Sequence, residues 1–245
     1  MDNKIISKFT QPIVNNLETE GGVFLINKPL KWTSFDVVNK LRSRLTRLFK
    51  DKKYKVGHAG TLDPLATGLL ILCSGKMTKQ IDTLMGMTKG YTGTFKLGET
   101  TPSYDAESDV DATFPTAHIT PSVLEAARVQ FLGEFDQMPP QFSAIKKDGR
   151  PLYESARKGE VVKVDPRKVH IYQFDIQQLT DNEISFYVKC TKGTYIRSLA
   201  YDFGKACGSG AYLTSLVRTE IGEYKIENAW DLEGLAKEIE KWSDG

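Results

Sequence analysis

Apolar positions in the first part of the chain fall into runs that predict a strand followed by a helix. The run Val23 to Ile26 is closed by Pro29, which is typical of a short buried strand. Thr33 and Asp36 then have the spacing of a capping box, which predicts the start of a helix. The apolar stripe expected for this helix consists of Val37, Val38, Leu41, Leu45 and Leu48.

The same rules predict the remaining elements. Apolar runs bounded by turn residues predict strands at 55–58, 69–73, 90–97, 169–176, 184–190 and 211–220. Capping residues and helical periodicity predict helices at about 76–85, after Thr120-Pro121, at 152–158, after Thr194 and at 231–242. Strands and helices intermix without strict βαβ alternation, so the predicted fold class is α/β of the α+β type. We expect a mixed, mainly antiparallel central sheet flanked by helices and loops.

Length and composition bound the class of protein. A chain of 245 residues is long for one domain, although mixed α/β enzymes of this size often fold as one unit. Residues 1–20 show no sustained periodicity and predict a loosely held N-terminal extension to a domain spanning 21–245. No apolar run approaches the roughly 20 residues that cross a bilayer, and the N-terminus has no signal-peptide pattern. We therefore expect a cytoplasmic protein without membrane contacts.

The cysteines and the distribution of charges indicate which kinds of site to expect. Cys73, Cys190 and Cys207 lie far apart without C-x-x-C spacing or a nearby histidine pair, so we expect free thiols and no metal site. The net charge is only +2, but the charges are unevenly distributed. Eight basic residues cluster in one stretch, namely Lys40, Arg42, Arg44, Arg47, Lys50, Lys52, Lys53 and Lys55. Most of them fall off the apolar stripe, so this helix is expected to offer a basic face to solvent or phosphate.

A glycine-rich loop holds the candidate catalytic residue. The segment 57–68 reads GHAGTLDPLATG, in which Asp63 is the carboxylate, placed between a leucine and a proline. Glycines there permit close approach of the backbone to a ligand. Taken alone, an aspartate before proline is better explained as a turn residue.

The whole string, however, closely resembles the active-site signature of TruB-type tRNA pseudouridine synthases. Further segments resemble the same family in the same order, namely Asn27-Lys28-Pro29 with Thr33-Ser34, Lys89-Gly90-Tyr91, Tyr104-Asp105-Ala106 and Lys192-Gly193-Thr194-Tyr195-Ile196-Arg197. Residues 144–159 resemble the RNA-gripping thumb of that family, which we place at about 139–165. The resemblance runs from about Gly22 to Leu235 and implies the pseudouridine synthase fold.

The resemblance implies that a uridine at position 55 in the T-loop of tRNA becomes pseudouridine. The N1 glycosidic bond breaks, the uracil turns and C1′ rejoins at C5, without a redox change, so no cofactor is expected. Asp63 either attacks C1′ or stabilises positive charge there, and both roles need an ionised carboxylate. Burial raises the pKa of an aspartate and a nearby arginine lowers it. Arg197 is the partner that the resemblance implies for Asp63.

The resemblance also implies substrate contacts at residues with ordinary structural explanations. Tyr91 would stack on the flipped uracil, and Tyr195 and Leu216 would line its pocket, although all three types are by default core residues. His58 would hold the RNA loop, or else act as a structural capping residue. Asp105 would assist base flipping, but the neighbouring segment 100–104 departs from the family pattern. Lys28 is equally explained as a phosphate contact or a turn residue.

The substrate is expected to be the T-stem-loop of tRNA, bound by a monomer. Lys146, Lys147 and Arg150 in the thumb-like segment are candidate contacts to the RNA backbone, because lysine and arginine supply most phosphate contacts. The family commonly carries a C-terminal PUA domain, and this chain is expected to lack it. RNA affinity would then rest on the catalytic domain.

Two other functions remain open from the sequence. An N-glycosidase that stops after bond cleavage needs a similar aspartate and loop, and release of free uracil would identify it. A non-catalytic RNA-folding module would explain the basic helix and a base-flipping site. The joint presence of Asp63, Tyr91 and Arg197 favours the synthase over this module.

Overall fold

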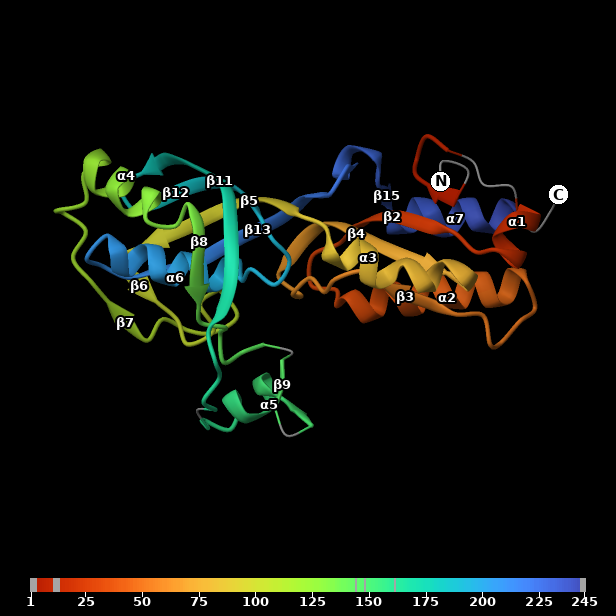
Figure 1. Cartoon of the computed structure of the whole chain (residues 1–245), viewed down its shortest axis with the longest axis horizontal. Coiled ribbons are helices and arrows are strands. Elements are labelled where there is room, and N and C mark those ends of the chain that lie inside the picture. Colours follow the sequence, from red (N-terminus) through yellow and green to blue (C-terminus); the bar gives the residue numbers. More distant parts are fainter. Residues whose placement is uncertain (1–3, 11–13, 144, 148, 161, 243–245) are drawn as a thin grey trace. The chain divides into compact units, whose positions relative to one another are not determined.

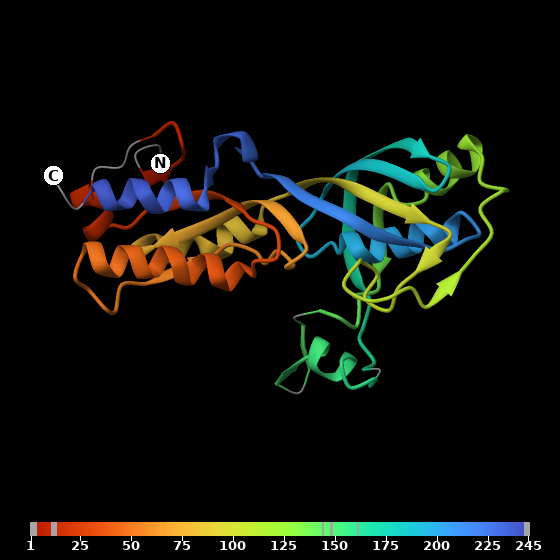
Figure 2. The same cartoon turned by 180° about the vertical axis from the view of Figure 1, so that it is seen from behind.

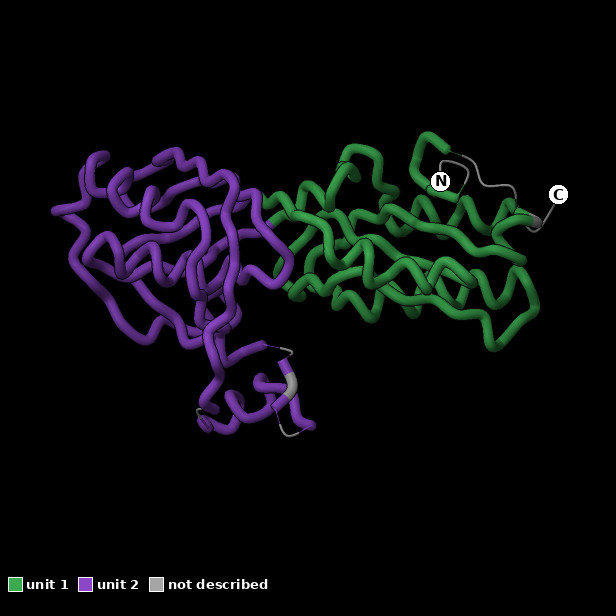
Figure 3. Tube along the Cα trace, viewed as in Figure 1, with its two compact units in different colours: residues 1–91, 217–245 green, residues 92–216 purple. Residues whose placement is uncertain are grey.

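The computed structural model describes residues 4–10, 14–143, 145–147, 149–160 and 162–242 (Figure 1). The chain divides into two compact units (Figure 3). Unit 1 comprises residues 1–91 and 217–245, and unit 2 comprises residues 92–216. The chain leaves unit 1 within strand β5 (Lys89–Leu97) and returns to it within strand β13 (Ala211–Ile221).

Unit 1 is built around two antiparallel strands. Strand β2 (Val23–Lys28) pairs with β4 (Ala66–Ser74) so that Val23 lies opposite Cys73 and Lys28 opposite Gly68. Strand β3 (Val56–His58) pairs antiparallel with β4, and β14 (Tyr224–Lys225) pairs antiparallel with β13. Strands β1 (Ile5–Ile6) and β15 (Trp230–Asp231) both run parallel to β2. These parallel and antiparallel pairings confirm a mixed sheet.

Both faces of β2 and β4 are covered, which explains their continuous apolar sequences. Phe24, Ile26, Leu70 and Leu72 belong to one core cluster, and Val23, Leu25, Leu69 and Ile71 to another. Helices α2 (Ser34–Leu48) and α7 (Leu232–Lys241) cover the first face, and α3 (Ile81–Gly86) covers the second (Figures 1 and 2). Successive strand residues point to opposite faces, so neighbouring residues of β2 and β4 contribute to two different cores.

Helix α2 begins as the sequence predicts. Thr33 is its N-cap, and reciprocal hydrogen bonds between Thr33 and Asp36 complete the capping box. The expected stripe Val37, Val38, Leu41 and Leu45 is buried, with Leu48 packed at its edge. Two basic residues that flank this stripe form ion pairs with α7, Lys40 with Glu233 and Arg44 with Glu240. These two charges are therefore partly neutralised within unit 1.

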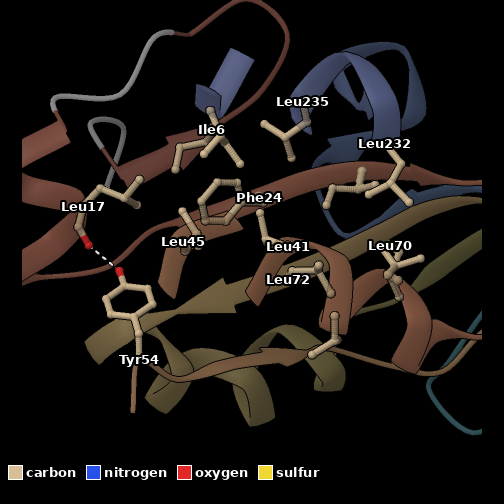
Figure 4. Close-up of a cluster of buried hydrophobic side chains, with 14 residues drawn as sticks. Ile6, Leu17, Phe24, Leu41, Leu45, Tyr54, Leu70, Leu72, Leu232 and Leu235 are labelled. Atoms are coloured by element: carbon tan, nitrogen blue, oxygen red, sulfur yellow. Dashed lines mark hydrogen bonds between the residues drawn. The ribbon is translucent and has the colours of Figure 1, made fainter. Parts of the chain in front are cut away.

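The described part of residues 1–20 is packed against the core. Ile6 of β1 and Leu17 of helix α1 (Val14–Thr19) are buried in the same cluster as Phe24 (Figure 4). The hydroxyl of Tyr54 donates a hydrogen bond to the carbonyl of Leu17. The expectation of a loosely held segment was therefore wrong for these residues, because two elements this short show no periodicity of their own.

Unit 2 has the strand order β13-β5-β12-β11-β8. Strand β11 (Arg167–Thr180) pairs antiparallel with β12 (Glu183–Cys190) and with β8 (Gly133–Gln137). The turn between β11 and β12 is Asp181-Asn182, as predicted. Phe95 stacks on Phe186 with ring centroids 4.3 Å apart, and Phe203 of helix α6 (Ile196–Ala206) packs beside Phe95. Helix α4 (Pro121–Val129) begins after its N-cap Thr120, as predicted.

Smaller elements of unit 2 lie outside this sheet. Strands β6 (Glu99–Thr100) and β7 (Ala112–Thr113) form one antiparallel pair. Strands β9 (Lys146–Lys147) and β10 (Arg150–Pro151) form another, followed by helix α5 (Leu152–Ala156). The described part of the thumb-like segment therefore contains a short hairpin and one helical turn.

Two predicted helix starts differ from the structure. The helix expected at about 76–85 is a 3-10 helix, η2 (Gly75–Gln80), followed by α3. The helix expected after Thr194 is capped by Tyr195, because the Thr194 hydroxyl donates to the carbonyl of Thr191 at 2.9 Å instead. A threonine can bond backbone on either side of itself, so its type alone does not identify a cap. Within the described residues, no helix combines the length and apolar character needed to cross a membrane.

Candidate active site

Asp63 lies in unit 1 on the loop between β3 and β4, and Ser34 holds that loop from one side. The hydroxyl of Ser34 accepts a hydrogen bond from the Leu62 amide at 2.8 Å and lies 3.2 Å from the Leu62 carbonyl, to which it donates. Ser34 is buried and is the first residue of α2. Asp63 itself is half-buried, and its carbonyl accepts from the Ala66 amide at 3.0 Å. The start of α2 therefore positions the residue next to Asp63.

Lys28 and Lys31 hold the loop on the other side of Asp63. The ammonium group of Lys28 donates to the carbonyls of Pro29 at 3.0 Å, Trp32 at 2.5 Å and Pro64 at 3.4 Å. The backbone amide of Lys31 donates to the same Pro64 carbonyl at 2.8 Å. Asp63 thus lies between two residues, Leu62 and Pro64, whose backbones are both fixed.

Of the two explanations left open for Lys28, a phosphate contact or a turn residue, its contacts favour the structural one. Its side chain is fully buried and its ammonium group is bonded to backbone carbonyls. Burial lowers the pKa of Lys28 to about 8, although the charge of Asp63 opposes this shift. Lys28 therefore stays protonated at neutral pH and stabilises the loop from inside.

Arg218 of β13 is a third clamp, which the sequence did not indicate. Its guanidinium donates from Nε to the Leu69 carbonyl at 2.8 Å, from Nη1 to Thr61 at 3.3 Å and from Nη2 to Gly60 at 3.1 Å. Arg218 is 1% exposed, so these bonds compensate a buried charge. An arginine within an otherwise ordinary strand sequence carries no signal that separates this role from a solvent-facing residue.

Gly68 of β4, just after this loop, is required by the same packing. Gly68 has φ +105°, a conformation that L side chains rarely adopt. A Cβ atom there would lie 2.3 Å from the backbone oxygen of Arg218. The glycine spacing seen in the sequence therefore reflects close approach of the chain to itself in unit 1.

Replacing Ser34 by alanine should destabilise unit 1. We expect the free energy of unfolding to fall by about 1–3 kcal/mol, since the buried amide and carbonyl of Leu62 lose their partner. Chemical denaturation would measure this change. Ser43→Ala, at an exposed position of the same helix, is the matched control and should stay within about 0.5 kcal/mol of the wild type. Equal stability of the two variants would contradict the clamp.

Two more expected site residues belong to unit 1. His58 of β3 is half-buried, and its Nδ1 atom lacks a hydrogen bond of normal geometry within the described residues. Burial and then the charge of Arg218 lower the pKa of His58, an effect that the nearby backbone of Gly60 partly offsets, so the ring is neutral at pH 7. Tyr91 of β5 is 9% exposed. Burial of Tyr91 agrees with the default core explanation as well as with a pocket wall.

In unit 2, Arg197 and Asp105 form a buried ion pair. Arg197 Nε lies 3.6 Å from Asp105 Oδ2, and both side chains are nearly inaccessible to solvent. Arg197 also donates to the carbonyls of Ser103 at 3.2 Å and Phe142 at 2.8 Å. Asp105 Oδ1 accepts from the hydroxyl of Ser103 at 2.6 Å and from the Glu107 amide at 2.9 Å. The structure therefore brings together two residues whose roles were expected separately.

The family resemblance implied Asp63 as the partner of Arg197, and that pairing stays a prediction. Asp63 belongs to unit 1 and Arg197 to unit 2. What the structure adds is a partner within unit 2 that the sequence did not indicate.

Other expected residues of unit 2 are less enclosed. Tyr195 and Leu216 are half-buried. The backbone of Tyr195 is fixed by the side chain of Gln137, which accepts from its amide at 2.8 Å and donates to its carbonyl at 3.0 Å. Arg150 and Lys147 are exposed, and Lys147 donates to the carbonyl of Lys163. The side chain of Lys146 lies outside the described residues.

The described residues contain no group of three or more histidine, cysteine, aspartate or glutamate side chains able to hold a metal ion. Cys73, Cys190 and Cys207 are buried, and none of them forms a disulfide within the described residues. Burial raises the pKa of Cys73 to about 12 and that of Cys207 to about 11, which keeps both thiols protonated.

Comparison with known proteins identifies the family. Residues 46–196 match the TruB family pseudouridylate synthase N-terminal domain. The chain is 58% identical over 214 residues to the tRNA pseudouridine synthase B of Flavobacterium johnsoniae, covering 87% of this chain and 93% of that protein. It is 50% identical over 222 residues to the protein of the same name from Bacteroides fragilis, covering 91% and 95%.

Solved structures show the same fold. A Cbf5-Nop10-Gar1 complex contains a chain that matches with a TM-score of 0.69 at 25% identity, covering 98% of this chain and 60% of that one. An H/ACA RNP bound to a substrate RNA containing 2′-deoxyuridine matches with a TM-score of 0.68 at 22% identity, covering 100% and 61%. The chain thus spans about three-fifths of those two chains, and the predicted α/β fold is confirmed. From this fold, the matched domain and the identity to both bacterial relatives, we conclude that the chain belongs to the TruB family of pseudouridine synthases.

Proposed function

We propose that this protein converts uridine to pseudouridine at position 55 in the T-loop of tRNA. The observation that carries the proposal is the 58% identity to a tRNA pseudouridine synthase B over 93% of its length. The clamped loop around Asp63 supports it, since an enzyme needs its reacting group held in a fixed position.

The reaction is an isomerisation in which every atom of the uridine is retained. The bond from C1′ to N1 breaks, the uracil turns, and a bond from C1′ to C5 forms. C5 loses a proton and N1 gains one, so no oxidant or reductant is needed. Asp63 acts at C1′ as the ionised carboxylate, either by attack or by stabilising positive charge. The side chains of Ser34, Lys28 and Arg218 form hydrogen bonds with the backbone of this loop and thereby keep Asp63 in place.

The other site residues receive roles consistent with this reaction. Tyr91 stacks on the flipped uracil, Tyr195 and Leu216 line its pocket, and His58 contacts the RNA loop. Asp105, held by Arg197, assists flipping of the base. We assign Lys28 to positioning of the loop rather than to phosphate binding, because its ammonium group is buried.

Residues 21–245 are proposed to form the catalytic domain, and residues 139–165 its RNA-gripping thumb. The hairpin of β9 and β10 places Arg150 opposite Lys147 at the start of this segment. The proposed partner is the T-stem-loop of tRNA, bound by a monomer in the cytoplasm.

Mapping of pseudouridine tests the function directly. Purified protein incubated with an unmodified tRNA transcript should form pseudouridine at the T-loop uridine and release no uracil. Release of free uracil would identify an N-glycosidase instead. Binding without either product would identify a non-catalytic RNA-binding protein.

The thumb should contribute to RNA affinity mainly through phosphate contacts. Replacing Lys146, Lys147 and Arg150 by alanine should make the salt dependence of the dissociation constant shallower, by about 0.7–0.9 in log-log slope for each contact removed. The rate on saturated RNA should change less. A double variant of α7, Lys237→Ala with Lys241→Ala, is the control for lost surface charge. An unchanged salt dependence in the triple variant would show that these thumb residues do not contact the RNA backbone.

A further inference from the structure

Two large apolar side chains are exposed beside the loop that carries Asp63. Leu30 is 53% exposed and Phe35 is 59% exposed. They lie on either side of the turn that joins β2 to α2, within unit 1. Side chains of this kind lose contact with water when a partner covers them, and aromatic rings supply large contact areas to interfaces. The apolar rim is defined here as Leu30 and Phe35.

The backbone of this rim is bonded directly to the Asp63 loop. Phe35 follows Ser34, whose hydroxyl bonds both the amide and the carbonyl of Leu62. Leu30 precedes Lys31, whose amide donates to the Pro64 carbonyl at 2.8 Å. Hydrogen bonds therefore connect the backbone around the apolar rim to Leu62 and Pro64, the two residues that flank Asp63 along the chain.

The rim is also held rigidly. Phe35 is the second residue of α2, inside the capping box in which Thr33 and Asp36 bond each other. Lys31 has φ +66°, a conformation that non-glycine residues adopt at a cost and that persists where surrounding contacts enforce it. With its backbone fixed in this way, Phe35 has only its two side-chain torsions to restrict on binding, which favours its use as a binding contact.

We propose that Phe35, flanked by Leu30, stacks on an unpaired base of the substrate RNA next to the uridine that reacts. This inference rests on the proposed function, which brings an RNA loop to Asp63. Flipping a uridine out of its loop leaves neighbouring bases without a stacking partner, and proteins that read unpaired RNA supply aromatic rings for such bases. Phe35 offers that ring on the backbone bonded to Leu62.

Binding measurements on the isolated T-stem-loop test the proposal. Phe35→Ala should weaken the dissociation constant about 5- to 150-fold, the range expected for one stacked base. Phe35→Trp should bind as tightly as the wild type, because it keeps a flat ring. Phe35→Leu should bind nearly as weakly as Phe35→Ala, because it keeps apolar area without a ring. Thermal unfolding should be unchanged, because the side chain is largely exposed.

Phe9 supplies the matched control. It is 73% exposed and follows β1, which pairs with β2 at Val23, whereas the Asp63 loop meets β2 at Lys28. Phe9→Ala should leave RNA binding unchanged. The proposal is overturned if Phe35→Ala binds like Phe9→Ala, or if Phe35→Leu binds like the wild type.

Failure of the proposed function would look different from failure of this inference. Wild-type protein that binds the stem-loop without forming pseudouridine refutes the function, while a selective effect of Phe35→Ala on that binding still supports the stacked base. Wild-type protein that does not bind the stem-loop overturns both.

Discussion

Asp63→Asn should abolish pseudouridine formation while leaving the fold and the RNA affinity in place. The amide is nearly isosteric with the carboxylate, but it carries no negative charge and is a poor nucleophile at C1′. We expect the rate on saturated tRNA to fall by at least about 10⁴-fold, the scale seen when a reacting group is removed. Single-turnover assays of pseudouridine formation would measure the rate, and equilibrium binding would measure the affinity.

A matched substitution separates chemistry from any general effect of losing a charge. Asp181 is exposed in the turn between β11 and β12, where asparagine is equally well accepted. Asp181→Asn should therefore react at the wild-type rate. Measurable turnover by Asp63→Asn would disprove the assignment of Asp63, whereas loss of RNA binding would mean that the carboxylate also organises the loop.

Arg197→Met should cause the second large loss, of both activity and stability. Arg197 pairs with Asp105 and donates to the carbonyls of Ser103 and Phe142, all within unit 2. Removing one partner of a buried ion pair leaves an uncompensated charge and costs about 3–5 kcal/mol of unfolding free energy. If Arg197 also keeps Asp63 ionised, as the family resemblance implies, the rate of the folded variant should fall severely as well.

A double-mutant cycle distinguishes these two effects. Asp105→Asn combined with Arg197→Met removes both charges and should recover part of the lost stability. If the double variant reacts as fast as Asp105→Asn alone, Arg197 acts only by holding Asp105. A much slower double variant would support a separate role in the reaction. Arg157→Met, which breaks an exposed ion pair with Glu107, should change stability by less than about 1 kcal/mol.

The sequence by itself determined several local elements and singled out Asp63 as the candidate reacting residue. The capping box of Thr33 and Asp36, the cap at Thr120 and the turn at Asp181-Asn182 all depend on residues within four positions of one another. Such patterns are readable because their partners are adjacent in the chain. Asp63 was singled out by the motif around it, and its catalytic role stays a prediction that the variant above tests.

Only the tertiary structure decided how that residue is held. Arg218 reaches the carbonyls of Leu69 and Gly60 from 149 and 158 positions away, and nothing in its own neighbourhood predicts this. Lys28 was equally explained from the sequence as a phosphate contact or a turn residue, and its complete burial and its carbonyl partners favour the structural role. The burial of Ile6 and Leu17 in the core could likewise not be predicted from the sequence. Burial of a single charged or apolar side chain depends on which distant segments surround it, and residue type and spacing do not contain that information.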